Sequence, residues 1–261
     1  MSLSVIIITK NEGSVIRRCL ESVAWADEIV VVDSGSRDNT TAICREFTDK
    51  VVHADWHGFG PQKNLALGLA TGEWVLSLDA DEYLPLGAEG LVREAISCGP
   101  GTSAYRLSRV SSYCGRWIRH SGWAPDHVTR LFARHQGRFS DDVVHERLEV
   151  NGRVATLDLT LYHEAFVDLE EVLAKVDRYS TLGAQSMHKR GRRATLGQAV
   201  THGLWAFFRT YLLRGGFADG REGFMLAISN AEGAYYRYAK LMLLSKSTDT
   251  SDASRGHRHD L

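Results

Sequence analysis

The sequence contains few cysteines, and none of them forms a CxxC pair. The four are Cys19, Cys44, Cys98 and Cys114, and three of them fall on apolar positions of segments with helical periodicity. This spacing excludes a zinc ribbon and a disulfide-stapled scaffold. Buried free thiols are typical of proteins that fold in a reducing compartment, so the cysteines predict a cytoplasmic protein.

The chain also lacks an excess of charge of either sign. Its 31 Lys and Arg residues against 32 Asp and Glu residues give a formal net charge of −1. Nucleic-acid-binding domains usually carry a net positive charge or a known binding motif, and with neither present we expect no nucleic-acid partner. No apolar run is long enough to cross a bilayer, and the residues after Met1 enter a strand pattern instead of a signal peptide.

The first hundred residues alternate apolar runs with amphipathic stretches. The runs typical of buried strands are Ser4–Thr9, Glu28–Val32, Lys50–His53 and Trp74–Leu78. Helical spacing of apolar residues fills the gaps between them, most clearly from Val15 to Val23 and from Pro61 to Ala70. This order of strands and helices predicts an α/β fold around a mostly parallel central sheet.

The pattern changes after a helix expected near Gly87–Ser97. The next strands are expected at Ala104–Val110, Thr129–Ala133, Val143–Val150 and Arg153–Tyr162, and Asn151 with Gly152 supplies a tight turn between the last two. From Asp168 almost to Leu244 the pattern is helical, and the polar residues beyond are typical of disorder. We expect a domain over residues 1–166, divided near residue 100, a helical region over 167–244 and a disordered tail over 245–261.

Polar side chains gather where three of the predicted strands end. They are Thr9, Asn11 and Glu12, then Asp33, and then Asp79 with Asp81. Ligands of an open α/β sheet bind outside the carboxyl ends of its strands, so these residues should converge on one crevice. Two neighbouring carboxylates can hold Mg²⁺ or Mn²⁺ and leave sites open for a diphosphate. Solvated turns or helix caps would use the same residue types, and one Asp-x-Asp is expected about once by chance in such a chain.

Four stretches taken together carry a family resemblance. The runs SVIIITKNE, DSGSRDNT, QKNLAL and WVLSLDADE resemble, in order and spacing, the family 2 glycosyltransferases. The closest likeness is to the lipopolysaccharide inner-core β-1,4-glucosyltransferases, and it covers about residues 3–244, with the specific motifs in the first 85. The resemblance implies an A-type glycosyltransferase fold, with donor binding over 1–100 and acceptor binding and catalysis over 101–166. It also implies a UDP-sugar donor, UDP-glucose above all, and a glycolipid acceptor of the lipopolysaccharide inner core.

The same resemblance implies roles for the residues that match these motifs. Contacts to the nucleotide base and ribose would come from Thr9, Asn11, Glu12 and Asp33. Lys63 would face the uracil or the phosphates, and Asp79 the ribose or the metal. Asp81 would ligate the Mg²⁺ or Mn²⁺ ion that clamps the diphosphate leaving group.

Enzymes of this kind invert the anomeric centre, which requires a carboxylate that deprotonates the acceptor hydroxyl. The sequence lacks the family's usual Glu-Asp pair in plain form and offers FSDDVVHERL over Phe139–Leu148 instead. We expect Glu146 to be the base, with Asp142 as the alternative. His145 and His163 are candidates for a phosphate or metal contact, and ordinary polar side chains at a surface or sheet edge would look the same.

A locally basic stretch with interleaved aromatic residues suits a phosphorylated sugar acceptor. The candidate acceptor residues are Arg116, Trp117, Trp123 and Arg130, although plain surface arginines would give the same pattern. Further on, Leu204–Leu213 is too apolar all round for a free surface helix. It either packs against Phe224–Leu244 or lies in the interface of the inner membrane, so we expect a cytoplasmic protein that is peripheral on that membrane.

Two rival functions remain at this point. A sugar nucleotidyltransferase is built on a similar α/β sheet, but it needs a glycine-rich phosphate loop near the N-terminus, and ITKNEGS is not such a loop. A non-catalytic nucleotide-sugar-binding module would keep the same pocket without turnover. The presence of both Asp79 and Asp81 argues against this second rival.

Overall fold

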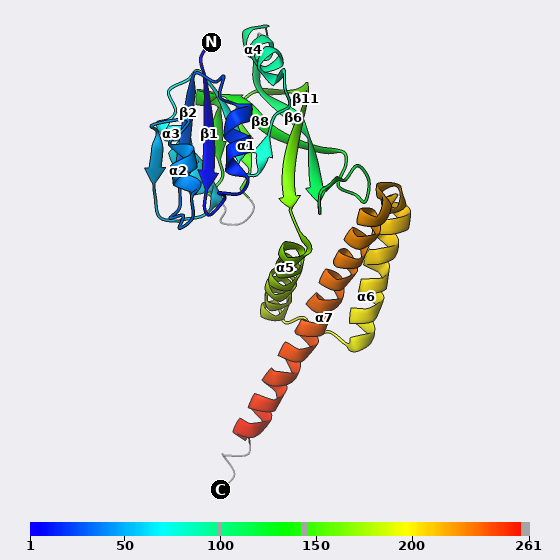
Figure 1. Cartoon of the computed structure of the whole chain (residues 1–261). Coiled ribbons are helices and arrows are strands. Elements are labelled where there is room, and N and C mark those ends of the chain that lie inside the picture. Colours follow the sequence, from blue (N-terminus) through cyan, green and yellow to red (C-terminus); the bar gives the residue numbers. More distant parts are fainter. Residues whose placement is uncertain (99–100, 142–145, 257–261) are drawn as a thin grey trace. The chain divides into compact units, whose positions relative to one another are not determined.

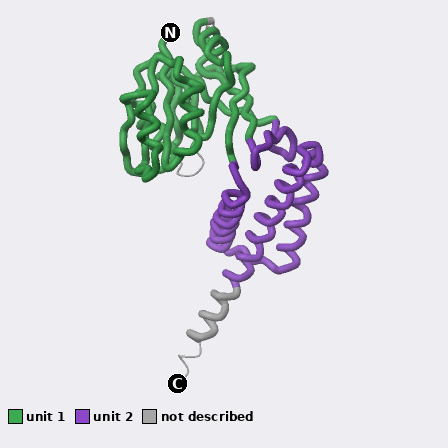
Figure 2. The backbone as a smooth tube through the Cα atoms, in the orientation of Figure 1, with its two compact units in different colours: residues 1–111, 125–165 green, residues 112–124, 166–261 purple. Residues whose placement is uncertain are grey.

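The structure is a computed structural model that describes residues 1–98, 101–141 and 146–256 (Figure 1). The chain forms two compact units, shown in green and purple in Figure 2. The sheet unit consists of Met1–Ser111 and Pro125–Ala165, and the helical unit of Ser112–Ala124 and Phe166–Leu261.

The first half of the sheet unit is a parallel sheet covered on both faces. Its strands are β1 (Leu3–Thr9), β2 (Glu28–Asp33), β3 (Val51–His53) and β4 (Trp74–Asp79), in the order β3-β2-β1-β4. The helices α1 (Ile16–Ser22), α2 (Thr40–Cys44) and α4 (Ala88–Cys98) pack on one face, and α3 (Phe59–Leu69) packs on the other. All seven residues of β1 are therefore buried, which explains why the sequence shows continuous apolar runs here.

The second half of the sheet is antiparallel. The order continues β4-β8-β6-β11-β5, with strands β8 (Asp126–Ala133), β6 (Thr102–Tyr113), β11 (Arg153–Phe166) and β5 (Glu82–Tyr83). A short strand β7 (Arg116–Trp117) pairs with β6, and β9 (Gly137–Phe139) pairs with β10 (Leu148–Val150) in a separate sheet, after the 3₁₀ turn η1 (Arg134–Gln136). The short strands β5, β7 and β9 were not predicted, because none of them contains two apolar residues in a row as β3 does.

The helical unit is built from three long helices. They are α5 (Leu169–Lys189), α6 (Leu196–Phe208) and α7 (Gly220–Gly256), with the π-helix η2 (Arg209–Leu213) and the 3₁₀ helix η3 (Gly216–Asp219) before α7. Asp168 caps α5 by accepting a hydrogen bond from the Glu171 N–H, and Thr195 with Gln198 forms a capping box on α6. Both α5 and α6 pack against α7.

The helix α7 extends to Gly256, and the disordered tail expected over residues 245–261 stays a prediction. No glycine or proline interrupts the chain between Ala234 and Arg255, so nothing in the backbone ends the helix before Gly256. Residues 257–261 of the expected tail lie outside the described residues. Within the described part of the chain, no helix combines the length and the apolar character needed to span a bilayer.

Candidate functional site

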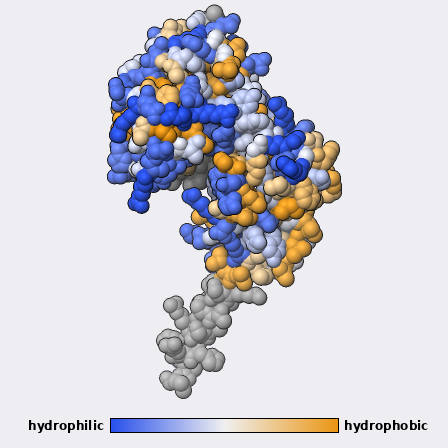
Figure 3. Space-filling view, viewed as in Figure 1, coloured by the Kyte–Doolittle hydropathy of each residue, from blue (hydrophilic) through white to orange (hydrophobic). Residues whose placement is uncertain are grey.

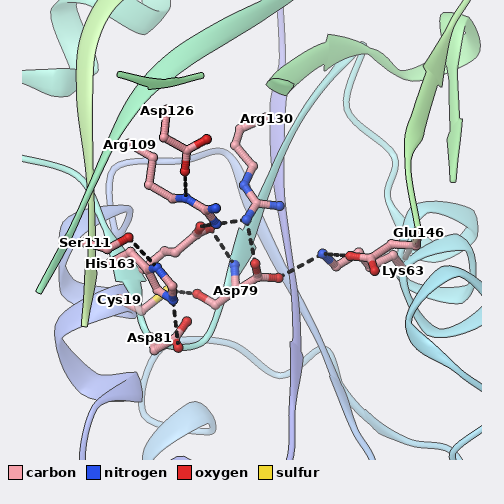
Figure 4. Close-up of polar contacts among 11 residues, drawn as sticks. Cys19, Lys63, Asp79, Asp81, Arg109, Ser111, Asp126, Arg130, Glu146 and His163 are labelled. Atoms are coloured by element: carbon pink, nitrogen blue, oxygen red, sulfur yellow. Dashed lines mark hydrogen bonds and ion pairs between the residues drawn. The ribbon is translucent and has the colours of Figure 1, made fainter. Parts of the chain in front are cut away.

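The Asp79 carboxylate lies at the end of β4 between two cations (Figure 4). Lys63 Nζ, on α3, is 2.9 Å from Asp79 Oδ1, and Arg130 Nη2, on β8, is 2.5 Å from Asp79 Oδ2. Burial raises the pKa of Asp79, but the charges of Arg130 and Lys63 lower it by more, so this pKa lies well below its usual range. Asp79 is therefore ionised at neutral pH, and both of its oxygens are already held.

A buried ion-pair network extends from Arg130 (Figure 4). Arg130 Nη2 is 2.6 Å from Glu82 Oε1, and Arg109 Nη1 approaches the same oxygen at 3.3 Å. The Glu82 side chain is fully buried, and its other oxygen accepts a hydrogen bond from the Asp79 N–H. Arg109 Nε also lies 2.8 Å from Asp126. Burial lowers the pKa of Arg130, and its two carboxylate partners raise it by more. Arg130 thus fixes the position of Asp79, and the acceptor contact expected of Arg130 stays a prediction.

The Asp81 carboxylate contacts His163, which lies on β11. His163 Nε2 is 3.2 Å from Asp81 Oδ2, and His163 Nδ1 lies 2.9 Å from Ser111 Oγ. The two meet because β11 pairs with β5, which places His163 directly across from Glu82. Both side chains of the pair are partly exposed, Asp81 at 30% and His163 at 20%.

The predicted base Glu146 joins the same cluster through Lys63. Lys63 Nζ is 2.9 Å from Glu146 Oε1 and 2.9 Å from Asp79 Oδ1, while the Lys63 side chain is only 3% exposed. One buried ammonium group therefore bridges two partly exposed carboxylates, Glu146 at 20% exposure and Asp79 at 32%. The other candidates of this segment, Asp142 and His145, lie outside the described residues.

Hydrogen bonds of the predicted site residue Asn11 join the loop after β1 to the loop after β2. Asp33 Oδ2 accepts hydrogen bonds from the N–H groups of Gly35 and Ser36, at 2.9 and 3.0 Å. Asn11 has φ of 57°, a conformation that asparagine tolerates well. Its side-chain oxygen accepts from the Arg37 N–H at 2.8 Å, and its own N–H donates to Ser36 Oγ at 2.8 Å. Asp33 and Asn11 thus shape the edge where the strands end.

Glu12 and Thr9, which were also predicted to contact the sugar-nucleotide donor, lie in the same region of the chain as Asn11. The Glu12 N–H donates to Thr40 Oγ1 at 2.9 Å, which anchors the β1 loop to α2. The Thr9 hydroxyl is buried at the end of β1 and has no hydrogen-bond partner within the described part of the chain. Because a buried hydroxyl without a partner is costly, this position fits one that a ligand or a water molecule satisfies.

The residues at the end of β4 fit a divalent cation in one specific pairing. Among the described residues no group of three His, Cys, Asp or Glu side chains is arranged to hold a metal ion. Asp81 with His163 offers one carboxylate oxygen and one imidazole nitrogen, which are ligand types that a divalent cation accepts. Asp79 is the poorer ligand, since Lys63 and Arg130 already occupy both of its oxygens.

The acceptor candidates do not form one cluster. Arg116 and Trp117, on β7, line a cavity of about 790 Å³ in the helical unit, together with Arg119 and Arg221. Trp123 lines a different cavity of the same unit. Arg130 belongs to the sheet unit and is buried.

Sequence reasoning missed the supporting residues Glu82, Arg109 and Ser111. Glu82 directly follows the Asp-x-Asp pair, but a charged residue there reads as part of a solvated turn. Arg109 and Ser111 lie on β6, whose alternation predicted a strand without showing which polar residues face the site. Their partners come from other strands, so no local pattern could have identified them.

Comparison with known proteins gives consistent matches. A family model described as Glycosyl transferase family 2 matches residues 4–145. An uncharacterised glycosyltransferase of Rickettsia conorii is 30% identical, over 96% of this chain and 94% of the relative. The lipopolysaccharide core biosynthesis glycosyltransferase LpsC of Rhizobium meliloti is 29% identical, over 92% of each chain. Among solved structures, residues 1–349 of S. aureus TarS in complex with UDP-GlcNAc align with a TM-score of 0.45 at 16% identity, covering 95% of this chain and 92% of that one.

Proposed function

The chain belongs to the family 2 glycosyltransferases, and we propose that it moves a hexose, glucose from UDP-glucose, onto a sugar hydroxyl of a lipopolysaccharide-core or similar glycolipid. Membership of the family makes the protein a glycosyltransferase and argues against the nucleotidyltransferase, while an activity assay decides against the non-catalytic module. The observation that carries the proposal is the cluster at the end of β4, where Asp81 meets His163 and Lys63 joins Asp79 to Glu146. The likeness to the lipopolysaccharide core enzyme supports the acceptor class.

The donor would bind along the strand ends. Asp33 and Asn11 hold the loops that would receive the base and ribose, and the Thr9 hydroxyl offers an unused polar group between them. Lys63 is the cation that contacts both Glu146 and Asp79, so we propose that it meets the negative charge of the diphosphate. Asp81 and His163 would hold a divalent cation, which stabilises the charge on the departing diphosphate when it is bound.

The transfer itself requires one carboxylate acting as a base. The acceptor oxygen forms a bond to the anomeric carbon while the bond from that carbon to the diphosphate oxygen breaks, and the configuration inverts. The acceptor proton passes to the Glu146 carboxylate, and UDP leaves with the electron pair of the broken bond. Glu146 is partly exposed and is linked through Lys63 to Asp79, and its nearness to the residues proposed to hold the donor supports this assignment.

Donor and metal binding are tested by calorimetric titration of UDP and of UDP-glucose, with Mn²⁺ and then with EDTA. We expect binding that requires the metal and is lost in Asp81→Ala, since that substitution removes the carboxylate of the proposed metal pair. Asp158→Ala is the matched control, because Asp158 is an exposed aspartate on β11. Equal binding with EDTA, or full binding by Asp81→Ala, would show that the metal pair is assigned wrongly.

The base is tested by comparing Glu146→Gln with Asp142→Asn in a transfer assay. If Glu146 is the base, its amide loses about a hundredfold or more in rate, because the proton then has no acceptor, while UDP binding persists. Glu149→Gln, an exposed glutamate on β10, is the control and should keep the wild-type rate. Full activity of Glu146→Gln would contradict Glu146 as the base and leave Asp142 as the candidate.

A glycolipid acceptor also calls for contact with a membrane surface. On α6 and η2, apolar side chains that recur every four residues are 42–67% exposed, and we call them the α6 stripe: Leu196, Val200, Leu204, Phe208 and Leu212. The other side of α6 packs against α7 through Gly203, next to the Ala231 carbonyl and the Tyr235 Cβ. Figure 3 shows apolar residues gathered over the helical unit. Packing therefore accounts for one side of this helix, and we propose that the stripe on the other side lies in the interface of the inner membrane.

A further inference from the structure

A cavity of about 510 Å³ opens among the helices of the helical unit. Helices α5 and α6 both pack against α7, and residues of all three line the space, with η2 and the segment Ser121–Trp123 (Figure 2). Small residues of α7, Gly233 and Ala234, form part of the lining. A Cβ atom added at Gly233 would meet nothing within 4 Å, so the space above this part of α7 is open.

The charged residues that line this cavity are all cationic. They are Lys175, Arg209, Arg214 and Arg237, and no carboxylate is among the described residues of the lining. Lys175 is paired with Glu171 at 2.8 Å. The three arginines are exposed and have no ion pair with any carboxylate in the ranges that the structure describes. Cationic side chains around a concave surface repel each other and attract anions, so the cavity is suited to an anionic ligand.

The rest of the lining combines aromatic and aliphatic side chains with five polar ones, Ser121, Ser180, Thr210, Ser229 and Asn230. The Trp123 ring stacks on Phe166 with centroids 5.9 Å apart, and Tyr113 meets Trp123 edge-on at 6.2 Å. Val172 and Leu226 complete this apolar lining. An inorganic ion does not pack against apolar surface of this kind, whereas an acyl chain or the apolar face of a sugar does pack against it.

We propose that this cavity binds the phosphate group of an anionic amphiphile, with the arginines on the phosphate and the aromatic residues on the apolar part. The guanidinium fork can bind two phosphate oxygens at once, which favours arginine over lysine for this task. The inference rests on the proposed function in one respect, namely that a phosphate-bearing glycolipid is the acceptor. It adds the place where such an acceptor is held by a group that does not react.

The probes are dihexanoyl phosphatidic acid, dihexanoyl phosphatidylcholine and inorganic phosphate, each titrated into the full chain by calorimetry. Phosphatidic acid should bind about tenfold or more tightly than either of the other two. The double variant Arg209→Gln/Arg237→Gln should weaken its binding by about tenfold or more, as expected for lost charge-assisted hydrogen bonds. Arg178→Gln/Arg192→Gln, which removes the same charge from exposed residues outside the cavity, should bind as the wild type does.

A second variant tests the cavity without touching its charge. Gly233→Phe places a ring in the open space and removes a glycine from the middle of α7, so it should fold and yet bind phosphatidic acid about tenfold or more weakly. This variant decides the question if the arginine variant folds poorly. Equal binding of phosphatidic acid and phosphatidylcholine, equal binding of inorganic phosphate, or an equal loss in the control variant overturns the proposal.

The same samples separate this inference from the proposed function. UDP titration with Mn²⁺ reports on residues of the sheet unit only, and it should be unchanged in all three variants. If the wild type binds phosphatidic acid but no UDP, the donor assignment fails and the cavity assignment stands. If it binds UDP but no phosphatidic acid, the cavity assignment fails alone.

Discussion

Glu82 is a fully buried carboxylate whose charge is balanced by Arg130 and Arg109. Replacing it in Glu82→Gln leaves the buried Arg130 with a single carboxylate partner and should lower the free energy of unfolding by about 3 kcal/mol, since breaking one side of a buried ion pair is costly. Urea denaturation measures this. Asp126→Asn, at the partly exposed end of the same network, should cost less than about 1 kcal/mol. Similar losses in the two variants would contradict a special role for the buried partner.

The candidate site could be predicted where each residue sits at the end of a strand. Asp33, Asp79 and Asp81 follow apolar runs, and that position alone places them at one edge of the sheet. The roles of residues that act through long-range pairing could not be predicted. Arg130 lies 51 positions from Asp79 in the chain, and its local surroundings resemble an exposed basic patch, so its burial against two carboxylates was not visible.

At the scale of elements, the α6 stripe should determine binding to membranes. Leu204→Ser/Phe208→Ser should reduce co-sedimentation with anionic phospholipid vesicles by about tenfold or more, because each apolar side chain moved out of water contributes roughly 1.5–3 kcal/mol. Leu173→Ser, at an exposed leucine of α5, is the control and should change little. Wild-type protein that does not sediment with such vesicles, or an equal effect of the control, would refute membrane contact by α6.

The elements predicted most accurately from the sequence are those whose residues are equally buried along the whole element. β1 is buried on both faces, so its apolar run marked it to within one residue. β6 and β11 are long strands whose burial varies along their length, and both extend beyond the predicted segments. Helix α2 covers only Thr40–Cys44, although Phe47 beyond its end packs against the same core as Ile43.

At the scale of the whole molecule, stability should depend on pH through Glu28. This carboxylate at the start of β2 accepts hydrogen bonds from Ser4 on β1, from Lys50 before β3 and from Thr71 before β4. It therefore connects β2 to these three segments. Partial burial raises its pKa, but these hydrogen bonds lower it by more, from 4.5 to about 2. Because the folded-state pKa is the lower one, the stabilisation is complete above pH 4.5 and is lost as the pH falls toward 2.

The size of this effect is about 3 kcal/mol between the two ends of that pH range. Urea denaturation at several pH values should show a smaller loss on acidification in Glu28→Gln than in the wild type, and a lower stability of the variant at neutral pH. Glu73→Gln, at an exposed glutamate before β4, should follow the wild-type profile. Identical pH profiles of Glu28→Gln and the wild type would exclude Glu28 as the source.

The chain passes between its two units three times, after Ser111, after Ala124 and after Ala165. The helical unit is therefore not a terminal module, although most of it follows the sheet unit in sequence. Tyr113 and Ile118, from the short inserted segment, are fully buried against Val172 and Leu226 of the helices. A recombination event that exchanged only the residues after 166 would separate these partners. An exchange of the helical unit between relatives would therefore have to replace both of its segments together.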